Sequence, residues 1–245
     1  MLLRLLRQTQ LGDLLSLVSP SLFDVISVPT VLRRARHIVA ESKRTWPDLR
    51  EELQRNLSGT VSLESSAGHG LGDLPDGAPR SVGQRILGVY FRQLHSPGPT
   101  ALDLRSPSWC LNGDVLHWNP TPLAVRWDPA FIDAMRAVYR GHYADDDATF
   151  LEGLGRLGLA EAAPLFRAHF GDGDATAHVF DRAHFVASFG AIFDHCKQTG
   201  VRLHSDFVPL GAYLAGLYDS LSDLGVPLDV AGAFHEAATP PKEGS

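Results

Sequence analysis

The sequence predicts a mainly α-helical protein with one short β-hairpin at about residues 109–118. Three observations point to this fold class. Apolar residues recur at helical spacing along most of the chain, glycines and prolines separate these segments, and only one place combines two strand-like runs with a hairpin turn. The chain has 245 residues, 44% of them hydrophobic and 20% charged, which is enough to bury a core of ordinary size and excludes global disorder.

The N-terminal segment, residues 1–57, is expected to be helical. A first helix is predicted over residues 2–18. A second starts at residue 30 and has an apolar stripe at helical spacing, with arginine and lysine filling the other positions. Pro47 predicts an interruption, because proline lacks the N–H that a helix uses, so the rest is either a kinked continuation or a separate short helix. Residues 58–80 are rich in Gly, Ser and Asp, which predicts a linker.

A helical domain is expected over residues 81–236, followed by a disordered tail at 237–245. Its hairpin is predicted from the strand-like runs on either side of Asn112 and Gly113, because Asn-Gly accepts the positive φ angles of a tight turn. After Pro129 the pattern is helical throughout. The helices expected in this domain are 81–94, 130–142, 147–158, 160–170, 179–198 and 206–224.

Charge and cysteine content narrow the range of partners and compartments. The chain has 22 Lys+Arg against 28 Asp+Glu, a formal charge of -6, so it lacks the overall basic surface that nucleic-acid binding requires. Residues 1–60 alone are net positive, which indicates either different partners for the two parts or simply solvated helix faces. Two cysteines and the absence of a long apolar run predict a cytoplasmic protein without a membrane span. The amphipathic start, Met1–Arg7, suggests peripheral contact with a membrane surface.

One order of motifs is more specific than any single motif. A helix ends in Leu94-His95, a loop contains Asp103, and a hairpin then ends in Asn119-Pro120-Thr121. This order resembles the catalytic half of a protein-kinase-like fold. The segments Trp127-Asp128-Pro129-Ala130-Phe131 and Gly200-Val201-Arg202-Leu203 resemble the AarF/UbiB family of atypical kinases, and the resemblance covers about residues 81–235.

The resemblance assigns roles to three residues. Asp103 stands at the position of the catalytic carboxylate that faces the acceptor hydroxyl. Ser108 stands where the family has a metal-binding Asn, and Asn119 where it has the metal-binding Asp, so both Mg-nucleotide positions are degenerate. Neutral Ser and Asn are poor ligands for a hard cation compared with a carboxylate. Ala101 replaces the histidine of the catalytic loop. Residues 1–80 also lack the run of strands that a nucleotide-binding small lobe needs.

These positions imply a pseudokinase-like regulatory or accessory protein. The family's link to quinone and membrane-lipid metabolism implies a protein partner in that area. One alternative is a weakly active atypical kinase or ATPase that uses Asp103 and Mg-ATP. Another is a helical ligand- or metal-binding protein unrelated to kinases, although the eleven histidines include no pair at the spacing of known helical metal sites and no metal site is expected.

Overall fold

The computed structural model describes residues 25–26, 28–171, 173 and 177–238, and this part of the chain is mainly α-helical, as predicted. The helix predicted over 2–18, the proposed membrane contact at Met1–Arg7 and nearly all of the predicted tail lie outside the described residues. The α-helices are α4 (Val28–Asn56), α5 (Ala78–His95), α6 (Pro129–Tyr143), α7 (Asp147–Arg156), α8 (Ala163–Phe170), α9 (Arg182–Thr199), α10 (Phe207–Leu224) and α11 (Val230–Ala238).

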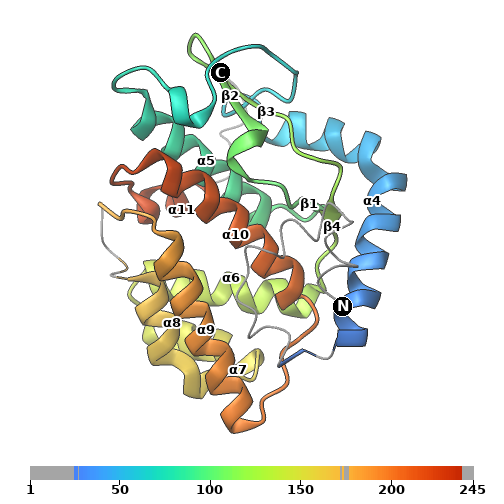
Figure 1. Cartoon of the computed structure of the whole chain (residues 1–245). Coiled ribbons are helices and arrows are strands. Elements are labelled where there is room, and N and C mark those ends of the chain that lie inside the picture. Colours follow the sequence, from blue (N-terminus) through green and yellow to red (C-terminus); the bar gives the residue numbers. More distant parts are fainter. Residues whose placement is uncertain (1–24, 27, 172, 174–176, 239–245) are drawn as a thin grey trace.

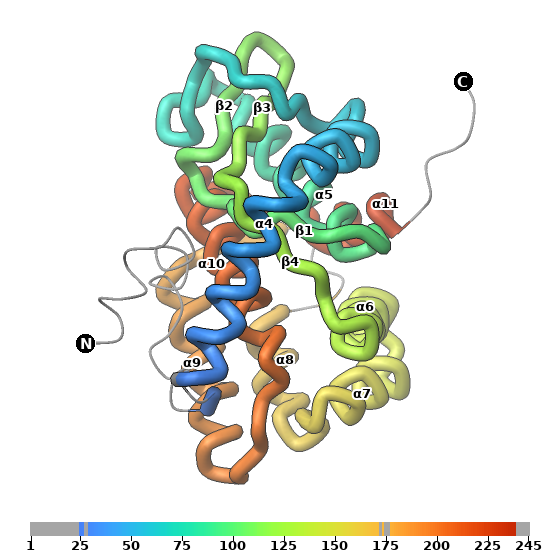
Figure 2. Tube along the Cα trace, turned by 90° about the vertical axis from the view of Figure 1, so that its right-hand side faces the viewer, coloured from blue at the N-terminus to red at the C-terminus, as the bar shows by residue number. Residues whose placement is uncertain are grey.

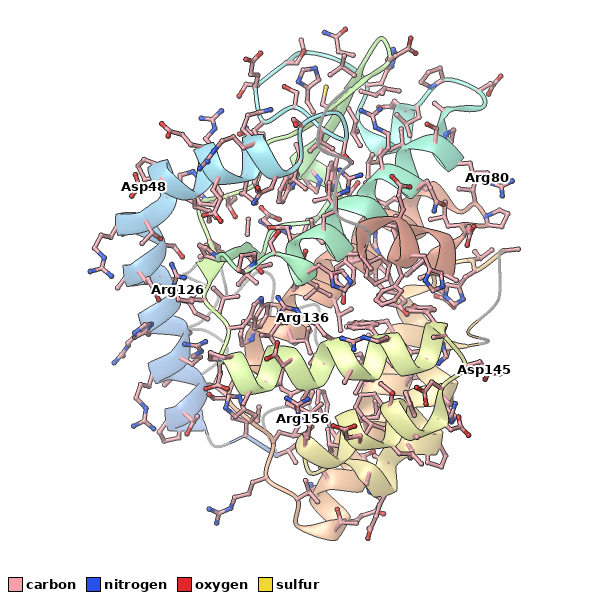
Figure 3. The ribbon with its side chains drawn as sticks, turned by 180° about the vertical axis from the view of Figure 1, so that it is seen from behind. Asp48, Arg80, Arg126, Arg136, Asp145 and Arg156 are labelled. Carbon is pink, nitrogen blue, oxygen red and sulfur yellow. The ribbon has the colours of Figure 1, made fainter. Side chains whose placement is uncertain are left out.

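The long helix α4 passes through Pro47 without ending. Figure 3 shows it changing direction beside Asp48, so the kinked continuation is the alternative that the fold adopts. Figure 2 shows α4 lying along the outside of the molecule. It is attached to the strand β4 (Ala124–Val125) through Ser42, whose hydroxyl accepts a hydrogen bond from Ala124 N at 2.8 Å.

The predicted hairpin consists of β2 (Trp109–Asn112) and β3 (Val115–Trp118). The turn is shifted by one residue from the expected position. Asn112 pairs with Val115, so Gly113 and Asp114 form the turn, and of these two only Gly113 has a positive φ, of 56°. A second small sheet, which the sequence did not predict, pairs β1 (Thr100–Ala101) with β4 in antiparallel fashion.

The segment expected as a linker packs along the hairpin. Ser62 N donates to Leu116 O at 2.9 Å, and Trp118 N donates to Ser62 O at 2.8 Å. Further along, His69 N and Leu111 O are joined at 2.9 Å. The segment also forms a short 3₁₀ helix, η1, at Leu71–Asp73. Two other 3₁₀ turns are η2 (Ser106–Ser108) and η3 (Ala160–Ala162), the latter opening the region predicted as one helix over 160–170.

The helix α10 is the centre of the fold, and Figure 1 shows it running diagonally through the middle of the molecule. Its own residues are apolar or small on nearly every side, and most of them are buried. Gly225 ends it in the left-handed conformation, at φ 60°. A single cluster of buried apolar side chains extends from Ile26 in the N-terminal segment to Phe234 in α11. No helix in the described ranges is long and apolar enough to cross a membrane.

Candidate functional site

The pairing of β1 with β4 closes a loop around Asp103. Ala101 pairs with Ala124, and Leu102 N donates to Leu123 O at 2.9 Å, so the chain leaves and re-enters the small sheet at neighbouring positions. Between these points lie Asp103, the hairpin β2–β3 and the residues that follow the hairpin. The sheet therefore holds the Asp103 loop against the end of the hairpin.

The carboxylate of Asp103 is completely buried and surrounded by donors. Arg105 forms a bidentate ion pair with it, Nε to Oδ1 at 2.8 Å and Nη2 to Oδ2 at 3.0 Å. Thr121, which follows the hairpin, donates to Oδ2 from its hydroxyl at 2.8 Å and from its backbone N–H at 3.1 Å. All of these donors come from the loop and the hairpin end.

The same contacts determine the protonation state of Asp103. Burial alone would raise the pKa of this carboxyl, because it removes water from the charged form. The hydrogen bonds and positive charge of Arg105, together with the two hydrogen bonds from Thr121, outweigh burial and lower the pKa below its ordinary value. The carboxylate is thus ionised at neutral pH, and its charge is balanced within the protein.

The backbone of the Asp103 loop is fixed from two sides. From the hairpin, the indole Nε1 of Trp118 donates to Asp103 O and that of Trp109 donates to Leu104 O, each at 2.9 Å. These indoles are cross-strand partners and stack with their ring centres 5.4 Å apart. From α10, the carboxylate of Asp219 accepts the backbone N–H of Ser106 at 3.0 Å. The loop conformation therefore depends on both the hairpin and the central helix.

The two other predicted site residues lie at the open end of the hairpin. Asn119 N donates to Ser108 O at 2.8 Å, which holds these two residues together. Two residues after Asn119, Thr121 donates to the carboxylate of Asp103. Ser108 is buried, whereas Asn119 is exposed. The structure thus gathers Asp103, Ser108 and Asn119 in one corner, and it adds two residues that the sequence analysis did not single out, Arg105 and Thr121.

The donor set of this corner does not suit a magnesium ion. Its one carboxylate, Asp103, is already engaged by Arg105 and Thr121, and the remaining polar side chains, Ser108 and Asn119, are neutral. Magnesium in proteins is held mainly by carboxylates, phosphates and water. More widely, no group of three or more His, Cys, Asp or Glu side chains is placed to hold a metal ion within the described part of the chain.

The comparisons with known proteins name no relative. A scan against protein-family models gives no match, and a search of curated proteins finds none with significant similarity. The chemistry of the corner at Asp103 therefore has to be inferred from its own geometry.

Proposed function

We propose that the chain is a kinase-like protein that does not transfer phosphoryl groups and acts as a regulatory or accessory protein. The observation that carries this proposal is the state of Asp103. A catalytic base must come within hydrogen-bond distance of the substrate hydroxyl. This carboxylate is almost fully buried; its Oδ1 accepts from Arg105, and its Oδ2 accepts from Arg105 and Thr121.

The kinase-like part of the proposal is supported by topology. In a kinase-like fold the loop aspartate and the residue after the hairpin must face one site, because one serves the acceptor and the other the metal. Here the pairing of β1 with β4 and the indole of Trp118 hold the Asp103 loop beside the hairpin end. The order helix α5, loop, hairpin and helices is the order that the sequence resemblance implies.

The loss of phosphoryl transfer is supported by what surrounds the loop. The two metal positions carry neutral Ser108 and Asn119. Among the described residues before α5 there is the helix α4 and the short η1 but no strand element, so nothing in that range supplies a β-rich nucleotide lobe. A pseudokinase that has lost nucleotide chemistry would act through its surfaces.

The outer face of α4 supports an acidic protein as the partner. Before Pro47, four basic side chains of this helix are exposed, namely Arg33, Arg36, Lys43 and Arg44. At about 100° per residue they fall within an arc of roughly 100°, on one side of the helix. Like charges this close repel one another, and the rest of the chain is acidic. An acidic partner would offset that repulsion. We place the protein in the cytoplasm because it has only two cysteines, and at the periphery of the membrane because of its amphipathic start, Met1–Arg7.

Calorimetric titration of the full chain with Mg-ATP tests the proposal. We expect no saturable magnesium-dependent binding and no phosphate release that scales with protein concentration. Tight binding that requires magnesium and is lost in Asp103→Ala would overturn the pseudokinase assignment, and phosphate release lost in Asp103→Asn would establish the weakly active kinase instead. Asp133→Asn, which changes an exposed carboxylate of α6, is the matched control. If Asp103→Ala does not fold, titration of the unmodified chain with and without magnesium still decides the question.

A further inference from the structure

A second region of the molecule has the form of a binding site. An open groove of about 980 Å³ lies between α5, α11 and the turn that follows α4. Its lining residues include Ser81 and Gly88 of α5, Asp229 and Gly232 at the α11 side, and Ser58 to Thr60 of the turn. Asp103 is not among the lining residues, so this groove is separate from the corner described above.

The groove has two cationic side chains without an ion-pair partner among the described residues. Of its two carboxylates, Glu236 is paired with Arg92 at 3.2 Å, and Asp229, which stays charged, accepts the backbone N–H of Gly232 at 2.7 Å. That leaves Arg80 and Arg85. Neither has a carboxylate within ion-pair distance among the described residues.

Arg85 is held in place before any ligand arrives. Its Nε donates to Thr60 O at 2.8 Å and its Nη1 to Asp114 O at 3.0 Å, so two backbone carbonyls fix the guanidinium at the edge of the groove. Burial lowers the pKa of Arg85, because the cation has lost part of its hydration, and the charge of Asp114, beyond ion-pair distance, offsets this only in part. An anion next to Nη2 would replace the hydration that the cation has lost. Because the guanidinium is already fixed, it loses little conformational entropy when the anion binds.

Gly88 leaves space in the groove, although the packing around α5 does not require a glycine at this position. Glycine inside a helix is less stable than alanine, so a glycine there usually has a reason. For Gly83, one turn away in α5, the reason is clear, because an added Cβ would lie 2.8 Å from the side chain of Leu228. At Gly88 an added Cβ would meet only Thr60 Cγ2, at an ordinary 3.8 Å. The fold would tolerate a side chain there, but the space in the groove would be lost.

We propose that this groove binds a phosphomonoester, with the phosphate between Arg80 and Arg85 and the esterified group over Ser81 and Gly88. A phosphomonoester carries a charge of about -1.5 to -2 at neutral pH, which matches two arginines without ion-pair partners better than a monocarboxylate does. The volume of about 980 Å³ exceeds what a free phosphate ion fills, so the esterified group has room beside it. This inference does not depend on the function proposed for the Asp103 corner.

Isothermal titration calorimetry of the full chain with glycerol 3-phosphate tests the inference. We expect saturable binding that weakens as the salt concentration rises. The same phosphate chemistry occurs on lipids, so sedimentation with phosphatidic acid vesicles, against phosphatidylcholine vesicles, identifies the source. Binding to glycerol 3-phosphate indicates a soluble ester, and binding to phosphatidic acid vesicles alone indicates a lipid. No saturable binding to either probe would overturn the proposal.

Two substitutions and their controls locate the site. Arg80→Gln should weaken binding about tenfold, because one charge-assisted hydrogen bond is lost, and Gly88→Leu should do at least the same by filling the groove. The controls are Arg156→Gln and Gly155→Leu in α7, an exposed arginine and a glycine with nothing within 4 Å of its added Cβ. Figure 3 shows Arg80 and Arg156 on separate parts of the molecule.

The four variants together show whether the ligand binds at the groove or elsewhere on the protein. Both α7 variants should bind like the unmodified chain. All four should keep its melting temperature within a few degrees, because the two arginines and Gly155 are exposed and a Cβ at Gly88 would make only an ordinary contact with Thr60. Equal weakening by the α7 variants would show that binding is not at the groove. The pseudokinase proposal is tested with Mg-ATP and this one with glycerol 3-phosphate and phosphatidic acid vesicles, so a failure of one can be told apart from a failure of the other.

Discussion

The guanidinium of Arg34 lies 2.6 Å from the buried carboxylate of Asp206, and this contact joins α4 to the beginnings of two other helices. The other oxygen of Asp206 accepts the backbone N–H of Asp128 at 2.8 Å, immediately before α6, while Asp206 itself precedes α10. Arg34 also donates to the backbone carbonyl of Arg126. One ion pair therefore connects three helices that are far apart in the sequence.

We expect Asp206→Ala to destabilise the fold by about 3 kcal/mol, because it leaves a partly buried guanidinium and a backbone N–H without their acceptor. Urea unfolding at neutral pH measures the change. Arg33→Met is the control, since Arg33 is the exposed neighbour of Arg34 on the same helix, and it should alter the free energy of unfolding by less than about 0.5 kcal/mol. Equal effects of the two substitutions would show that the contact with Asp206 contributes little.

Asp103→Asn should lower the free energy of unfolding by about 2 to 4 kcal/mol at neutral pH, because it leaves Arg105 facing a neutral acceptor in a buried site. The pKa of Asp103 is lowered in the folded state, so its contribution is present above the unfolded pKa and is lost as the pH falls through the folded value. The difference between the two proteins should therefore shrink in acid. Urea unfolding at neutral pH and near pH 3 measures it, and a difference that does not depend on pH would contradict an ion-pair role.

The corner at Asp103 shows what local sequence can and cannot predict. Motif order predicts Asp103, Ser108 and Asn119 as one site. Their shared role stays a prediction, while the fold places the three residues near one another. The bidentate contact of Arg105 was not predictable. An Asp-x-Arg sequence alone does not predict whether the two side chains will contact each other. Here the carboxylate is buried, and Arg105 is the cation that pairs with it.

The hairpin and the contacts between distant helices show a second limit. Asn112-Gly113 marked the hairpin correctly, yet the turn lies one residue later. Strand register places Trp109 opposite Trp118 so that both indoles are buried, and that pairing outweighs the local preference for Asn-Gly. The Arg34–Asp206 pair and the groove beside Gly88 join segments far apart in the chain, and no pattern within one segment encodes them.

His169 should make the protein less stable in mild acid. Its ring is buried among aromatic side chains, and burial is the main reason why its pKa falls to about 3, with the nearby His184, His178 and His142 adding to the effect. Between an unfolded pKa of about 6.5 and the folded value, only the unfolded chain takes up the proton, so stability falls as the pH falls. At about pH 5 the loss from this one residue is on the order of 2 kcal/mol.

Unfolding in urea at neutral pH and at about pH 5 tests this for His169→Leu. The variant should lose much of the acid sensitivity, even if it is less stable at both pH values for want of the hydrogen bond between the ring and Ser188 at 2.8 Å. His69→Gln, at an exposed position, should keep the full pH dependence. An unchanged pH dependence in His169→Leu would assign the acid sensitivity to other groups.

The contact between α6 and α7 provides a comparison of two glycines on one helix. A Cβ added at Gly153 would lie 2.7 Å from Val138 N and 2.9 Å from Ala134 O, both on the backbone of α6. Backbone atoms inside a helix cannot move aside, so Gly153→Ala should force the helices apart and cost about 2 to 3 kcal/mol, as overpacked sites do.

At Gly155, two residues on, nothing lies within 4 Å of an added Cβ. Gly155→Ala should therefore leave stability unchanged or raise it by up to about 1 kcal/mol, because alanine favours the helix. In thermal and urea unfolding, Gly153→Ala should lower stability while Gly155→Ala should not. If both shifted stability the same way by the same amount, helix preference rather than close packing would govern this interface.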